Sequence, residues 1–161
     1  MDDTNFALSL QLADTIDEVS DGKDGQAAAL IPRYHEFQLR ALDGDLDAAS
    51  DAAMIALARA CRWIDPPLEG LNAAFLFSQQ ANERGMPEDH LRFAMVLALC
   101  AVRERALGHD ALADLLHAQA ITLTELAAAQ GDVRAEEALP AIVDAVSAEA
   151  CSIAARTQRG A

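Results

Sequence analysis

The segment "HDALADLLH" carries the densest group of residues in this chain that could do chemistry. It runs from His109 to His117 and holds two carboxylates, Asp110 and Asp114, with an imidazole at each end. Carboxylates and imidazoles serve as general acids and bases, and they are also common metal ligands. Asp114 and His117 stand three residues apart, like the acid-x-x-His pairs of helical di-metal proteins. Asp110, Asp114 and His117 are therefore the candidate metal ligands of this sequence.

Helical geometry favours a simpler interpretation of the same segment. At 100° per residue, the two acids and His117 share one face of a helix, and that face continues through Ile121 and Thr124. The opposite face holds five leucines: Leu112, Leu115, Leu116, Leu123 and Leu126. We expect the leucines to face the core and the acids to face solvent, with Asp110 at the first turn. Gln119 lies among the leucines, so we expect it to be a buried amide that needs a partner.

A di-metal site needs carboxylates from several helices, and the sequence offers no second acid-x-x-His pair. It also lacks a glycine-rich phosphate loop, a G-x-S-x-G turn, an H-E-x-x-H helix and zinc-ligand spacing. We therefore assign no metal, no cofactor and no catalytic residue. The absence of these motifs favours a protein that is not an enzyme, without excluding an enzyme.

Composition predicts the fold class. A chain of 161 residues suits one domain with a single core. It contains 36 alanines and only 4% aromatic residues, and its β-branched residues form no alternating run. Alanine is the best helix former and a poor strand residue. We expect an all-α protein whose small side chains let the helices approach closely.

The formal net charge of −14 limits the partners, because such a surface repels nucleic acids and anionic membranes. We expect a protein partner, either a second copy or an unknown and basic protein. The chain begins Met-Asp-Asp without the basic region of a signal peptide, and its uncharged run Phe93–Val102 is too short to span a membrane. Its three cysteines form no C-x-x-C pair. These features predict a cytoplasmic protein.

Turn-forming residues divide the chain into about seven helices. The expected helices cover, in order, residues 4–19, 26–42 (with 31 as an alternative start), 46–64, 65–84, 88–107, 110–130 and 132 to the end. We expect Pro140 to kink or split the last of them. Acids stand at the starts (Asp45, Asp47, Asp65, Glu88, Asp89, Asp110, Asp132), where the helix dipole favours them. Residues 1–25 are an acidic helix and loop that we expect to dock loosely, and residues 26–161 form one helical domain.

The spacing of three glycines predicts the topology. Gly85, Gly108 and Gly131 recur every 23 residues, so each unit is one helix plus a short turn, and consecutive helices must run antiparallel. We expect a compact antiparallel bundle of six or seven helices around the apolar segment Phe93–Val102. The alternative is an array of tetratricopeptide-like helical hairpins, although the two-helix unit of about 46 residues exceeds the 34 of that repeat.

The helix over residues 65–84 offers a candidate partner surface. Phe75 and Phe77 point to different faces of it, and an amide-rich segment follows. The predicted surface comprises Phe75, Phe77, Gln79, Gln80 and Asn82.

Two functions follow from these features. The first is a non-enzymatic protein-interaction or adaptor module that associates with itself to form a homo-oligomer. The alternative is a small-molecule-binding bundle, or an enzyme, with a pocket between helices. The lining expected for that pocket is His90, Gln119, Tyr34 and Trp63 with Met95 or Cys100.

Overall fold

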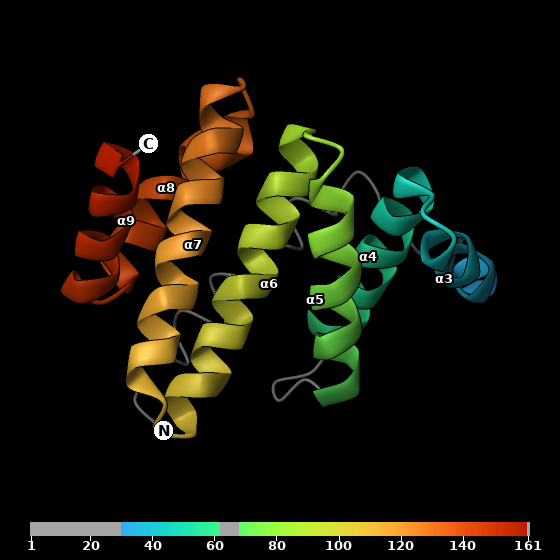
Figure 1. Cartoon of the computed structure of the whole chain (residues 1–161), viewed down its shortest axis with the longest axis horizontal. Helices are drawn as coiled ribbons and strands as arrows, with labels where there is room; N and C mark the ends of the chain where they lie inside the picture. The colour runs from blue at the N-terminus through green and yellow to red at the C-terminus, as the bar shows by residue number, and fades with distance from the viewer. Residues whose placement is uncertain (1–29, 62–67, 161) are drawn as a thin grey trace.

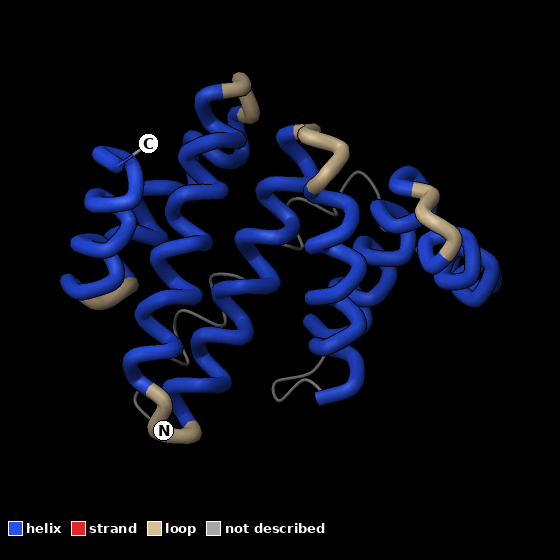
Figure 2. The backbone as a smooth tube through the Cα atoms, in the orientation of Figure 1, coloured by secondary structure: helices blue, strands red, loops and turns tan. Residues whose placement is uncertain are grey.

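The computed structural model describes residues 30–61 and 68–160, and in these ranges the protein is all-α (Figure 2). The elements are η1 (Ile31–Arg33), α3 (Tyr34–Leu42), α4 (Leu46–Cys61), α5 (Leu68–Asn82), α6 (Pro87–Ala106), α7 (Asp110–Ala129), α8 (Val133–Ala145) and α9 (Ala148–Gly160). They pack as a compact bundle, which confirms the predicted fold class. The acidic segment 1–25 and Asp65 lie outside the described residues.

Most helices pack on their neighbours in sequence, and α6 and α7 hold the bundle together. In Figure 1, α3, α4 and α5 lie to one side of α6, and α7, α8 and α9 lie to the other. α6 contacts α4, α5 and α7, while α7 contacts α6, α8 and α9. The segment Phe93–Val102 lies in α6 and is almost entirely buried, which confirms the prediction of a central apolar helix.

A tight turn around Gly108 joins α6 to α7. Gly108 has a φ of +83°, a conformation that costs little only for a residue without a Cβ. Its amide donates to the carbonyl of Arg105, and the amide of His109 donates to that of Glu104, so the last carbonyls of α6 are satisfied. His109 is also the N-cap residue of α7. The same turn follows α3 at Gly44 and α7 at Gly131, which explains why glycines marked these helix boundaries correctly.

The C-terminal region differs from the prediction, because it forms two helices and the break is not at Pro140. α8 continues through Pro140 and ends at Ala145. Val146 then adopts extended backbone, and the hydroxyl of Ser147 accepts the amide of Ala150 at 3.1 Å, which caps the start of α9. A capping serine after an extended residue therefore ends the helix, and the proline does not.

Alanine dominates the interior. More than half of the buried apolar residues in the described ranges are alanines, and many of them are completely inaccessible. Larger side chains fill the space between α4, α5 and α6, where Leu57, Leu71, Leu91 and Val96 pack in one cluster. No helix in the described part of the chain is both long enough and apolar enough to cross a membrane.

Candidate functional site

The two acids of the opening segment are held by an arginine of the preceding helix. Arg105, near the end of α6, lies 3.4 Å from Asp110 and 2.5 Å from Asp114. The hydroxyl of Ser147 also donates to Asp114 at 2.7 Å, so this carboxylate links α6, α7 and the start of α9. The hydrogen bond from Ser147 and the guanidinium of Arg105 hold the pKa of Asp114 below its usual value. Asp114 is therefore an ionised link between three helices.

His117 does not face solvent, contrary to the expectation from sequence. Its side chain is buried at 3% exposure, and neither ring nitrogen has a hydrogen-bond partner among the described residues. Burial lowers the pKa of His117 to about 4, and the positive charge of Arg105 acts in the same direction. Asp114 opposes this shift but does not bond to the ring. His117 is therefore a neutral imidazole near pH 7.

The faces of α7 differ from the expectation at most of its positions, although Asp110 is exposed and Leu123 is buried as expected. His117, Ile121 and Thr124 are buried, whereas three of the five leucines are exposed: Leu112 at 45%, Leu115 at 55% and Leu126 at 43%. Gln119, expected to be a buried amide, is also exposed. The buried face of α7 is instead rich in alanine: Ala113, Ala118, Ala120 and Ala127. Helices approach each other closely through alanine, and Leu112, Leu115 and Leu126 remain outside, while Leu116 and Leu123 pack in a core cluster with α6.

Six residues along the outward side of α7 form a line that we call the α7 strip. It comprises Leu112, Leu115, Gln119, Thr122, Leu126 and Ala129. Their spacing alternates between three and four residues, which is the heptad spacing of helices that pair side by side. Thr122 is half-buried and the other five are exposed. The leucine pattern was visible in the sequence, but its outward orientation was not.

The α7 strip contains no charged residue, although the chain carries a net charge of −14. The acids of α7 are not part of the strip, and each has a polar partner. Asp110 precedes the strip and pairs with Arg105, Asp114 is held by Arg105 and Ser147, and Glu125 bonds to Gln158 of α9. The outward side of α7 is thus an uncharged strip with three exposed leucines on a strongly acidic protein.

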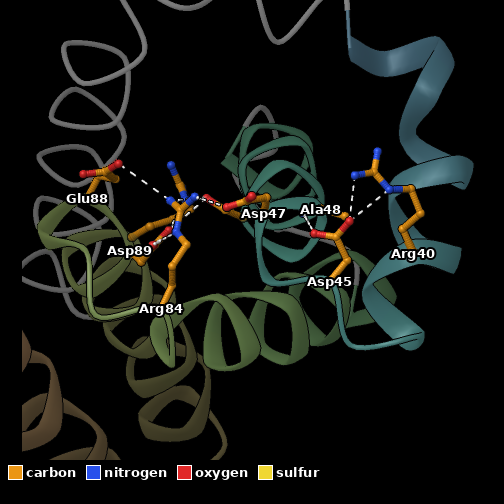
Figure 3. Close-up of polar contacts among 9 residues, drawn as sticks. Arg40, Asp45, Asp47, Ala48, Arg84, Glu88 and Asp89 are labelled. Carbon is orange, nitrogen blue, oxygen red and sulfur yellow. Dashed lines mark hydrogen bonds and ion pairs between the residues drawn. The ribbon is translucent and has the colours of Figure 1, made fainter.

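A second polar cluster, which the sequence analysis treated as helix-start charge, surrounds Asp89. Asp89 lies in the first turn of α6, but its side chain is completely buried. One carboxylate oxygen accepts the hydroxyl of Ser50 at 2.8 Å and Arg92 at 3.1 Å, and the other accepts Arg84 at 2.7 Å. Arg84 also reaches Asp47 on α4 and Glu88 on α6 (Figure 3). The cluster therefore ties α4 and α6 to the turn after α5.

The Asp89 cluster is closed to further chemistry. Arg84 and Arg92 both donate to the Ser50 hydroxyl, at 3.2 and 3.0 Å, while that hydroxyl donates to Asp89. The serine therefore has no free base beside it, and the carboxylate has no free oxygen for a metal or a proton. Burial lowers the pKa of Arg92, which its carboxylate partner opposes. The arrangement stabilises the junction of three helices.

No group of three or more His, Cys, Asp or Glu side chains is placed to hold a metal ion within residues 30–61 and 68–160. In the opening segment, Asp110 and Asp114 pair with Arg105, and His109 pairs with Glu104 at 2.7 Å. The hydrogen bond from His109 lowers the pKa of Glu104. Each of these carboxylates is thus engaged by a cationic or hydrogen-bonding side chain.

The predicted partner surface on α5 is largely engaged inside the molecule. Phe75 packs edge-on against Phe93 of α6, with ring centroids 5.7 Å apart, and Phe77 packs against clusters from α3 and α4. Gln80 donates to the carbonyl of Ala41 at 2.6 Å, and Asn82 accepts from His90 at 2.5 Å. Gln79 is exposed. The different directions of the two phenylalanines are confirmed, while binding of a partner by this face stays a prediction.

The residues expected to line a small-molecule pocket lie in different environments. Met95 and Cys100 are buried in one core cluster, and Tyr34 packs against its edge. His90 is buried and bonded to Asn82, whereas Gln119 is exposed on the α7 strip. Trp63 lies outside the described residues. The structure therefore does not bring His90 and Gln119 together as that hypothesis requires.

Comparison with protein-family models, with curated proteins and with solved structures finds no match to this chain.

Proposed function

We propose that the protein is a non-enzymatic helical interaction module that docks a protein partner on the α7 strip. The observation that carries this proposal is the heptad-spaced line of exposed leucines and uncharged residues along α7. Exposed leucines at this spacing stabilise a helix pair when a second helix covers them. The polar clusters around Asp89 and Asp114 support this function indirectly, because they hold together the helices that carry the strip.

The test is a charge introduced in the middle of the strip. Leu115→Glu places a carboxylate on α7 where a docked helix would bury it, which is costly for an unpaired charge. The matched control is Leu76→Glu, because Leu76 is a comparably exposed leucine on α5, with 62% exposure against 55%. Both variants are expected to fold, since both side chains are exposed, and circular dichroism with thermal unfolding checks this.

Sedimentation velocity and quantitative affinity capture are then compared for the wild type and the two variants. We expect L115E to lose self-association, or to lose a protein that both the wild type and L76E capture. If L115E and the wild type sediment alike and capture the same proteins in equal amounts, the proposed function is wrong.

A further inference from the structure

We propose that the occupant of the α7 strip is the α7 strip of a second copy, packed antiparallel about a two-fold axis. This inference rests on the proposed function and names its partner. The strip is one face of a single helix of 20 residues, and its first and last positions, Leu112 and Ala129, are 17 residue steps apart. At about 1.5 Å per residue, that is a contact line of about 26 Å.

The lack of charge along the strip fits a second strip better than it fits a basic partner. A basic partner would be recognised by free carboxylates beside the docking surface. The exposed residues of α7 after Asp110 are uncharged, and the half-buried Asp114 and Glu125 are already bonded to Arg105 and Gln158. An uncharged strip is complementary to another uncharged strip. A second copy offers one, and none of the six strip residues carries a charge that the pairing would bury.

The order of residues along the strip is self-complementary when the second helix runs in the opposite direction. In antiparallel helix pairs the first position of a heptad on one helix packs against the fourth position on the other. Applied to this strip, Leu115 of one copy faces Leu126 of the other, and Gln119 faces Thr122. Leu112 then faces Ala129, a large residue against a small one. Each of these three residue pairs forms one layer of the interface, and each layer occurs twice, as an isologous interface requires.

The two central layers fix this register. The amide of Gln119 needs a hydrogen-bond partner once it is covered. The hydroxyl of Thr122 donates to the carbonyl of Ala118 at 3.1 Å, so its oxygen is free to accept from the glutamine of the other copy. A polar residue at such a position favours the register that satisfies it. Leucine layers on both sides exclude water from this pair.

The size of the contact sets the expected affinity. One helix pair of this length lies at the low end of specific interfaces, below about 1,200 Å² of total buried area. We therefore expect a dimer that dissociates at about micromolar to submicromillimolar concentrations, and the experiments need concentrations up to several hundred micromolar. The expected mass is twice the 17.1 kDa of one chain.

Cysteine crosslinking tests the pairing residue by residue. Two differently tagged variants, Leu115→Cys and Leu126→Cys, are mixed and oxidised mildly. In the proposed register the two cysteines face each other, so we expect a covalent dimer that contains one chain of each kind. Leu115→Cys alone should give none, because in a homodimer its two cysteines lie about 16 Å apart along the axis, beyond the reach of a disulfide. The parent chain, which has Cys61, Cys100 and Cys151, gives the background.

Other outcomes overturn this inference without overturning the proposed function. Self-linked Leu115→Cys would show parallel pairing, and a mixed product of Leu115→Cys with Gln119→Cys would show a shifted antiparallel register. A wild type that remains at 17.1 kDa at several hundred micromolar, while a partner is still lost in L115E, would show that the strip binds a different protein.

Discussion

His117 makes the stability of the folded protein depend on pH in the acidic range. The imidazole is buried without a hydrogen-bond partner among the described residues, and its pKa falls from 6.5 to about 4 on folding. The folded state therefore binds the proton less readily than the unfolded state. Between pH 6.5 and pH 4 the unfolded chain is protonated first, so stability is lost as the pH falls through this window. The full pKa difference between the unfolded and folded states corresponds to a loss of about 3 kcal/mol in the free energy of unfolding.

Replacing His117 with leucine should remove this loss. H117L puts an apolar side chain of similar size where an unsatisfied ring stood, so we expect it to stabilise the fold by about 1 kcal/mol or more at pH 7. At pH 5 the advantage should grow by about a further 2 kcal/mol, because the unfolded wild type gains a proton and the variant does not. Urea unfolding at both pH values measures this. An advantage that stays constant with pH would mean that His117 titrates normally in the folded protein.

At the scale of the helix, two glycine-to-alanine substitutions should change the stability of the protein in opposite directions. One is at Gly108, in the turn between α6 and α7, and the other is at Gly70, inside α5. Gly108 has a φ of +83°, so Gly108→Ala should cost about 1 kcal/mol through backbone strain, although a Cβ there would touch nothing. Gly70 lies within α5 and its Cβ would also meet nothing, so Gly70→Ala should stabilise the protein by roughly 0.5–1 kcal/mol. Denaturant unfolding at one pH compares them. Equal effects at the two sites would contradict the assigned turn.

The same turns show why helix boundaries could be predicted from sequence. A glycine with positive φ followed by Asp45, His109 or Asp132 ends one helix and begins the next, and all of its hydrogen bonds lie within six residues. Local chemistry of this kind can be read from a short window. The end of α8 was missed because the visible signal, Pro140, does not end the helix, whereas the cap that Ser147 supplies seven residues later starts a new one.

The orientation of α7 could not be predicted by the same means. Periodicity shows which residues share a face, but both faces of this helix are apolar: leucine on one, alanine and isoleucine on the other. Contacts with α6, α8 and α9 decide between them, and close helix packing favours Ala113, Ala120 and Ala127 over the larger leucines. Similarly, the buried carboxylate of Asp89 accepts a hydrogen bond from Ser50, which is 39 residues away in the chain. Such contacts have no local signature.

At the scale of the whole molecule, the net charge of −14 and the uncharged strip act against each other in the proposed dimer. Two copies repel one another through the rest of their surfaces, while the strip attracts through apolar contact. Salt screens the charge repulsion between the two copies and leaves the apolar contact between the strips largely unchanged. The Debye length falls from about 30 Å at 0.01 M to about 10 Å at 0.1 M ionic strength. Self-association should therefore tighten as salt is added.

We expect the dissociation constant of the dimer to fall by at least about threefold when ionic strength rises from 0.01 M to 0.1 M. Sedimentation equilibrium at fixed pH gives the constant at each salt concentration. L115E provides the control, because it should stay monomeric at both concentrations if salt acts on the strip-mediated dimer and does not simply reduce solubility. A dimer that weakened with salt would instead be held by opposite charges. Its interface would then have to include the arginines outside α7, since the strip has no charged group to offer.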